Sequence, residues 1–445
     1  MTISRCAASL PRTLVATATG VCLLAGCGAL PGVSGGSGGS GGSGRTITVM
    51  TFAPEGTQAT NMPGMTGMAK AYERWANTRG GLNGHRLRVL TCNEKNTPGG
   101  AADCARQAVA ENAVAVVGSY SQHGRAFMAP LEAEGIPFIG GYGVSSEEFQ
   151  SPLSYPVNGG QPVLIAGAGH QLSRACDQVA LVRPDTLAGD TLPVMLNAGL
   201  RANKMADAAD ILAAEDSADF KPQAGEAIAH TTGSGTGGTG TGTGKEREGK
   251  ARGCVTAVLG ERTETFFDAF RRTEPQRSKP QISSVLGSVS QSLVDRTGGR
   301  ESPFEGAYVT SWYPVASDPL WEPMRRVVAD FAFGDDTVDP DDSGVQTTWI
   351  AYTVLGEIMN RFDKEESIDA RRIRRSLNEA RPVRTAGLTP DLSWRSEDMR
   401  AVAGFPRIVN GRVTFQVVRD GRLVAQPGEQ PMDMTPTLVQ APRTA

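Results

Sequence analysis

Glycine and hydroxyl-bearing residues gather at two places in the first half of the chain, each directly after a short apolar run. The first is 118–121, Gly-Ser-Tyr-Ser, and the second is 140–146, Gly-Gly-Tyr-Gly-Val-Ser-Ser. Glycines let backbone amides approach a ligand closely, and hydroxyl groups add short donors and acceptors. These residue types predict a binding site for a small polar ligand, with contacts from Ser119, Tyr120, Ser121, Gly141, Tyr142 and Ser145.

The segments around these two places alternate between strand and helix patterns. Segment 86–91 alternates like a strand, and the apolar runs 113–117 and 136–139 are typical of strands buried on both faces. Segments 104–112 and 124–133 have helical spacing. The alternation predicts right-handed parallel crossovers, and ligands of such sheets bind at the carboxyl ends of the strands. Both hydroxyl-rich stretches follow such ends.

A second alternating series predicts a second lobe. We expect the chain to cross to it at 155–158 and to return at 307–313, where Trp312 and Tyr313 could line a pocket or pack structurally. Loops after its expected strands carry three further candidate ligand contacts. Exposed loop acids are usually solvated, so a plain surface role for the two acids is the alternative. The candidates are Asp185, Glu261 and Ser288.

The composition excludes some classes of function. The 445 residues are enough for two lobes with separate cores. The formal net charge is −3 with both signs dispersed, and no basic stripe suggests a nucleic-acid partner. Segment 231–253 is rich in Gly and Thr and then in charge, which predicts a disordered insertion, although docking on a partner is an alternative.

The first residues are typical of an export signal. A basic start and the apolar run 14–24 lead to Leu24-Ala25-Gly26-Cys27, which resembles a bacterial lipobox. Cleavage before Cys27 would remove 1–26 and leave a lipidated cysteine, and the Gly/Ser segment within 27–44 would serve as a flexible tether. An ordinary signal peptide with an incidental cysteine is the alternative. We expect a protein anchored on the extracytoplasmic face of the cell membrane.

Removal of the leader with Cys6 and Cys22, and lipidation of Cys27, would leave four of the seven cysteines. In an exported protein, four cysteines suggest two disulfide bonds. Cys92 and Cys104 flank one short loop at the start of a helix. Cys176 and Cys254 each precede an apolar strand. If these two strands are parallel neighbours, their first residues lie side by side, and so do the two cysteines. Four cysteines allow three connectivities, and we expect the one that joins Cys92 to Cys104 and Cys176 to Cys254. Zinc binding is the alternative, without CxxC spacing to support it.

Catalysis has little support. Ser121 and His123 at a strand-to-helix turn superficially suggest a hydrolase, but the G-x-S-x-G pattern is absent from this turn, where Gly118 is followed by Ser-Tyr-Ser-Gln. The four histidines form no metal-ligand pair on one helix face. We therefore expect no enzymatic activity, no metal and no cofactor.

The order of these features resembles a known family. Segment 76–84, Ala-Asn-Thr-Arg-Gly-Gly-Leu-Asn-Gly, precedes a strand, Cys92 precedes a helix, and Val116-Val117-Gly118 and 134–139 follow at matching spacing. The chain is similar to the branched-chain amino-acid binding proteins, strongly over 47–149 and more loosely to about 424. The resemblance implies an α/β fold of the type I periplasmic-binding-protein kind, with two Rossmann-like lobes of parallel-rich sheet joined by three hinge crossings.

The resemblance also assigns roles. In such proteins one lobe holds the ligand carboxylate through a hydroxyl and strand-end amides, and a second-lobe acid takes the ammonium group. Ser119 or Ser121 matches the hydroxyl, Tyr142 matches a backbone donor, and Glu261 is the best ammonium partner. Val144 stands where a threonine is usual, which argues against a standard branched-chain amino acid. The first strand-to-helix loop would face the ligand through Glu55, Thr57 and Gln58, unless it is simply solvated.

The resulting prediction is an extracytoplasmic solute receptor that works with an ABC permease. Lobe 1 would comprise 45–156 and 312–404, and lobe 2 would comprise 157–311 and 405–425, leaving 426–445 as a loose tail. It would bind an amino acid or related compound by hinge closure. The alternative of another class is a ligand-sensing or scaffold lipoprotein without transport, and a hydrolase is the third possibility.

Overall fold

The computed structural model describes residues 45–441, with gaps at 58–59, 187–188, 215–216, 233–250, 261, 274–278, 286–287, 380 and 403. Contacts divide the chain into two units, Met1–Ser43 and Gly44–Ala445, and only the second contains described residues. Cys27, Gln58, Glu261 and most of the predicted insertion therefore lie outside the described residues.

The first sheet has five parallel strands in the order β2-β1-β3-β4-β5. Strand β1 pairs with β2 along its whole length, from Thr46 opposite Arg86 to Ala53 opposite Asn93. The short apolar runs predicted as buried strands form β3 and β4, so both predictions are confirmed. The strands are β1 (Thr46–Ala53), β2 (Arg86–Asn93), β3 (Ala115–Val117), β4 (Phe138–Ile139) and β5 (Ser154–Tyr155).

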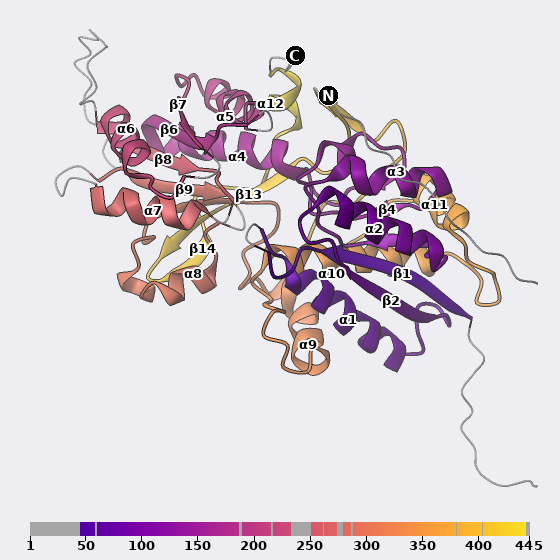
Figure 1. The fold of residues 1–445 in the computed structure, drawn as a ribbon. Helices are drawn as coiled ribbons and strands as arrows, with labels where there is room; N and C mark the ends of the chain where they lie inside the picture. The colour runs from indigo at the N-terminus through magenta and orange to yellow at the C-terminus, as the bar shows by residue number, and fades with distance from the viewer. Residues whose placement is uncertain are drawn as a thin grey trace, which may run out of the picture. The chain divides into compact units, whose positions relative to one another are not determined.

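Helices cover both faces of this sheet (Figure 1). Val49 and Ala53 of β1 belong to the core cluster that includes residues of α1 and α10, whereas Met50 and Phe52 belong to the one that includes residues of α2 and α3. This alternation follows from the two-residue period of a strand. The helices of this part are α1 (Pro63–Thr78), α2 (Pro98–Ala110), α3 (Gly124–Glu134), α9 (Glu322–Phe331), α10 (Ser343–Met359) and α11 (Ala370–Asn378).

The second sheet follows the order β14-β13-β10-β9-β8-β6-β7, with β15 paired to β13. Neighbours from β10 to β7 are parallel, and β13 is antiparallel to both β10 and β14. The parallel part confirms the second alternating series. The strands are β6 (Cys176–Pro184), β7 (Ala209–Ala213), β8 (Ala251–Ala257), β9 (Gln281–Val285), β10 (Tyr308–Ser311), β13 (Arg412–Arg419), β14 (Arg422–Ala425) and β15 (Met432–Asp433).

This sheet also has helices on both faces. Leu181 of β6 belongs to the cluster that contains residues of α4 and α5, and its neighbours Ala180 and Val182 belong to the cluster that contains residues of α6, α7 and α8. The helices are α4 (Gly160–Ala175), α5 (Thr191–Ala202), α6 (Lys221–Thr232), α7 (Arg262–Thr273) and α8 (Gln291–Arg296).

Both predicted disulfide bonds are present. Cys92 at the end of β2 is bonded to Cys104 in α2, with their Cα atoms 5.7 Å apart. Cys176 and Cys254 lie in the neighbouring strands β6 and β8, with their Cα atoms 6.0 Å apart. The second bond therefore ties together two parallel strands of the second sheet, as the sequence predicted.

The last part of the chain contains a small separate sheet, and one expectation for it is wrong. Strand β12 (Phe405–Ile408) pairs with β11 (Arg400–Val402) in this two-stranded sheet, and Ile408 belongs to the same core cluster as Val413 and Phe415 of β13. The segment expected as a loose tail contains β15 and α12 (Thr435–Val439), and Met434 and Leu438 are buried. Residues of α12 are in contact with α4 and α5, so burial of apolar side chains holds this segment in place.

Candidate functional site

The two hydroxyl-rich stretches lie next to each other at the carboxyl edge of the first sheet. The backbone N–H of Tyr142 donates to the carbonyl of Ser119 at 3.0 Å. The rings of Tyr120 and Tyr142 are 5.3 Å apart. The sheet order places β3 beside β4, and therefore brings together two loops that are about twenty residues apart in sequence. This juxtaposition is what the parallel-sheet prediction required.

The serine hydroxyls of the first loop are engaged within the protein. The N–H of Phe52 donates to Ser119 Oγ at 3.0 Å. Ser121 Oγ donates to Glu94 Oε2 at 3.0 Å and accepts the backbone N–H of His123 at 3.0 Å. Because His123 meets Ser121 through its backbone rather than its ring, the side-chain pair that a hydrolase would need is not formed.

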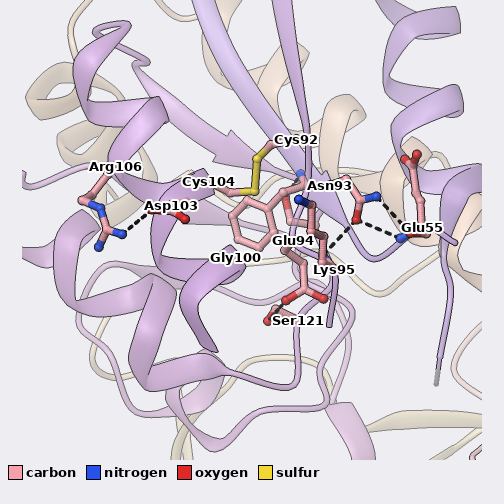
Figure 2. The surroundings of a disulfide bond; sticks show 12 residues. Glu55, Cys92, Asn93, Glu94, Lys95, Gly100, Asp103, Cys104, Arg106 and Ser121 are labelled. Carbon is pink, nitrogen blue, oxygen red and sulfur yellow. Dashed lines mark hydrogen bonds and ion pairs between the residues drawn. A yellow bond between two sulfur atoms is a disulfide. The ribbon is translucent and has the colours of Figure 1, made fainter. Parts of the chain in front are cut away.

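Glu94 is an acid that the sequence analysis did not single out. It follows β2, and Figure 2 shows it between the Cys92–Cys104 disulfide and Ser121. Its side chain is buried, and burial raises the pKa of Glu94, an effect that the hydrogen bond from Ser121 opposes. A Cβ on Gly100 would lie 2.1 Å from the carbonyl oxygen of Glu94, so the loop closed by the disulfide requires glycine there.

The second loop folds around Glu148. Its carboxylate accepts the N–H groups of Gly143 at 2.9 Å, Val144 at 3.1 Å and Ser145 at 3.0 Å, and the Ser145 hydroxyl at 3.0 Å. Glu148 is 2% exposed. Burial raises the pKa of Glu148 to about 7, while the four donors act in the opposite direction. A Cβ on Gly141 would lie 2.0 Å from Glu148 Oε2, which explains a glycine at that position.

Sequence reasoning missed Glu148, although a signal for it exists. Ser145 and Glu148 have the Ser-x-x-Glu spacing of a capping box, in which the acid accepts the backbone N–H of the cap residue. That pattern predicts the bond to Ser145. It does not predict the bonds to Gly143 and Val144, which depend on how the loop folds back over the acid.

The same loop contacts the segments where the chain passes between the two sheets. The hydroxyl of Tyr142 shares a hydrogen bond with Ser343 at 2.7 Å, and its ring packs edge-on against Trp312 at 5.3 Å. Trp312 donates through Nε1 to the carbonyl of Gly160 at 3.0 Å, and Asn158 Nδ2 donates to the Tyr313 hydroxyl at 3.1 Å. Trp312 and Tyr313 are both buried, so packing at the crossing accounts for them.

The candidates of the second sheet are less enclosed. Asp185 is exposed after β6, and its N–H donates to the carbonyl of Ala213 at 2.9 Å. Ser288 is half-buried after β9 and donates its N–H to the carbonyl of Val285 at 3.2 Å. No interaction recorded for the described residues joins either to the loops of the first sheet. As ligand contacts, Asp185, Ser288 and Glu261 stay predictions.

The loop after β1 is held by its own polar groups. Glu55 accepts the hydroxyl of Thr66 at 2.6 Å, and its backbone N–H donates to the side chain of Asn93 at 3.1 Å (Figure 2). The N–H of Thr57 donates to the Asn61 side chain at 2.7 Å. Glu55 therefore adds a carboxylate at the carboxyl edge of the first sheet, in the loop after β1.

Two features of the described residues bear on metal binding and on membrane crossing. Within residues 45–441, apart from the gaps given above, no group of three or more His, Cys, Asp or Glu side chains is placed to hold a metal ion. Across the same described part of the chain, no helix has both the length and the apolar character required to cross a bilayer.

The two parallel-rich sheets, each with helices on both faces, form a two-lobed α/β fold, and comparison with known families shows which class of protein has it. Residues 49–406 match the model of the periplasmic binding protein family. The chain belongs to this family, whose members are solute-binding proteins, and this confirms the resemblance to the leucine, isoleucine and valine binding proteins. No curated protein sequence is similar enough to match the chain.

Solved structures share the fold at low sequence identity. A substrate-binding periplasmic protein from Ralstonia solanacearum is 18% identical, with a TM-score of 0.65 over 85% of this chain and 100% of that one. A possible leucine/isoleucine/valine-binding protein from Rhodopirellula baltica is 12% identical, with a TM-score of 0.66 over 86% and 96%. A solute binding protein from R. palustris, in complex with 4-hydroxybenzoate, is 13% identical, with a TM-score of 0.65 over 87% and 97%.

Proposed function

We propose that this chain is a lipid-anchored receptor of an ABC importer that captures a small polar solute, an amino acid or related compound, between its two lobes. The observation that carries this proposal is the contact between the two strand-end loops, from Ser119 to Tyr142, beside Trp312 at a crossing between the sheets. Membership of the periplasmic binding protein family supports it. The lobes would comprise 45–156 with 312–404, and 157–311 with 405–425.

Hinge closure is the proposed mechanism because it explains both capture and transport. A solute enclosed between lobes is shielded from water, which strengthens each polar contact. Closure also creates a shape that a permease can distinguish from the open form, provided that the solute binds the closed form better. Asp185, Glu261 and Ser288 are the proposed contacts from the second lobe, and Ser119 to Ser121 and Gly141 to Ser145 provide the first wall.

A thermal-shift screen of the compact unit Gly44–Ala445 tests solute binding. The panel contains amino acids, their amides, aromatic carboxylates and small amines. A solute at a hundred times its dissociation constant should raise the free energy of unfolding by about 2.7 kcal/mol. If every compound leaves the unfolding temperature unchanged, the receptor proposal is contradicted for these solute classes.

The lipid anchor is tested separately in a bacterial host. The full chain should fractionate with membranes and incorporate a labelled fatty acid, and Cys27→Ser should abolish both properties. A matched Cys22→Ser variant should keep them, because Cys22 lies within the segment that is removed. Equal membrane association of both variants would contradict anchoring at Cys27.

A second candidate function is a ligand-sensing or scaffold lipoprotein without transport. It is favoured by the internal use of the Ser119 and Ser121 hydroxyls and of the Gly143 to Ser145 amides. The two candidates differ in their dependence on a permease. Solute uptake that requires this chain supports transport, whereas solute binding without any effect on uptake supports sensing.

A further inference from the structure

Three consecutive backbone amides converge on one carboxylate in the loop after β4. Gly143 donates to Glu148 Oε2, and both Val144 and Ser145 donate to Oε1. Successive N–H groups that point into one concavity form an anion-binding nest. Here the anion is part of the chain itself, and the Ser145 hydroxyl adds a fourth donor.

Helix capping explains only part of this arrangement. A capping box requires the acid to accept the N–H of the cap residue, which is Ser145. Gly143 and Val144 precede the cap residue. Without Glu148, their backbone amides would lack this acceptor. Glu148 therefore satisfies donors of the loop as well as those of the short helical turn at Ser146–Phe149.

The charge around the loop is also unsuited to a second anion. Burial raises the pKa of Tyr120, and the negative charges of Glu148 and of the buried Glu94 raise it further, so both acids act on the tyrosine that packs against Tyr142. A carboxylate brought against Glu148 would find no free N–H on these amides, and at a pH where Glu148 is ionised it would also meet a like charge in a poorly solvated place. A neutral or cationic group would not meet this repulsion.

We propose that Glu148 is a built-in acceptor that determines specificity: it fills the amide nest of 143–145 and excludes solutes that present a carboxylate to this loop. The solute of this receptor then presents an amine, amide or other neutral or cationic group there. This inference rests on the proposed function for its substrate class, whereas the occupation of the nest by Glu148 can be tested without any solute.

The nest is tested by chemical rescue. Glu148→Ala removes the carboxylate and leaves the donors of the loop unpaired, which should lower the unfolding temperature of the Gly44–Ala445 unit by about 5 °C. Added formate should restore most of this loss, because it can bind in the vacated nest, while chloride at equal ionic strength should not. Glu147→Ala is the matched control, since Glu147 makes none of these bonds.

Glu148→Gln provides the second variant. Its side chain fills the same space but places an NH₂ group against an N–H donor, so it should be destabilised and formate should not rescue it. If Glu148→Ala does not fold in buffer, the refolding yield in formate against chloride is the readout. Equal effects of formate on the wild type, Glu148→Ala and Glu148→Gln would overturn the assignment of the nest.

Matched pairs of solutes test the substrate class on the wild-type unit. Leucine against leucinamide and benzoate against benzamide differ in the group that would face the loop. We expect the amides to raise the unfolding temperature more than the carboxylates. The opposite order overturns the specificity proposal. No stabilisation by either set contradicts the proposed function instead, and leaves the formate experiment to decide the role of Glu148.

Discussion

At the scale of single residues, buried carboxylates set the conformation of both strand-end loops. Glu94 accepts the hydroxyl of Ser121, and Glu148 accepts three backbone amides and one hydroxyl. Glu94 directly follows β2, and Glu148 lies two residues beyond the hydroxyl-rich stretch 140–146. Their burial depends on contacts with loops distant in sequence, and so a single sequence cannot distinguish them from solvated acids.

The pH dependence of stability should show the effect of Glu148. Burial raises its pKa in the folded chain from 4.5 to about 7, so between these values the folded state binds more protons than the unfolded state. The stability contributed by Glu148 is thus present below pH 4.5 and is lost as the pH rises through about 7. We expect the stability advantage of the wild type over Glu148→Gln to shrink by roughly 3 kcal/mol at most across this window.

Urea unfolding of both proteins at a series of pH values measures this difference. Other titrating groups, including Glu94 and Tyr120, are common to both proteins and largely cancel. An advantage that grows with rising pH would contradict the proposed environment of Glu148.

Ser119 offers a second residue-scale prediction. Its hydroxyl accepts the N–H of Phe52 and is 0% exposed, so Ser119→Ala should leave a buried donor unpaired and lower the free energy of unfolding by about 1–3 kcal/mol. Ser146→Ala, at an exposed serine of the other loop, is the control and should have little effect. Equal urea midpoints for the two variants would mean that Ser119 has no structural role.

At the scale of elements, much of the fold could be predicted. The runs around Val116 and Phe138 are too short and too apolar for anything except buried strands, and the two cysteine pairs follow from parallel strand order and loop closure. Helix α8 was missed because six residues carry too little periodicity. The strand β15 and the helix α12 near the C-terminus were not predicted, because contacts with β13, α4 and α5 order them rather than a pattern in their own sequence.

The C-terminal helix gives an element-scale prediction with an internal control. Leu438 is 4% exposed and its neighbour Val439 is 62% exposed. Leu438→Ala should lower the free energy of unfolding by about 2–5 kcal/mol, because it leaves a cavity against the cluster that includes Phe415 and Met434. Val439→Ala should be nearly neutral. Similar denaturation midpoints for both variants would show that α12 does not pack on the core.

The two disulfide bonds should differ in their contribution to stability. Cys176 and Cys254 are 78 residues apart, whereas Cys92 and Cys104 are 12 apart. Loop-closure entropy then predicts a loss of about 4.5 kcal/mol when the Cys176–Cys254 pair is replaced by alanine and of about 3 kcal/mol for the Cys92–Cys104 pair. Denaturant unfolding of the two paired-alanine variants measures this, and a larger loss for the Cys92–Cys104 pair would argue against the entropic explanation.

At the scale of the whole molecule, the residues that join the two sheets are built for packing. Trp312, Tyr313 and Asn158 are buried and hydrogen-bonded where the chain crosses, and Tyr142 of the second loop packs against Trp312. A solute that binds at this loop would lie near Tyr142, a side chain that packs on the crossing. Binding and closure would be coupled through these side chains, provided that the solute favours one orientation.

Small-angle X-ray scattering of the Gly44–Ala445 unit, with and without each solute of the thermal-shift panel, tests the central claim most directly. Capture by closure predicts that at least one amine or amide lowers the radius of gyration, with a saturable dose dependence that follows its thermal stabilisation. A radius of gyration that no solute changes, even one that raises the unfolding temperature, would contradict capture by closure.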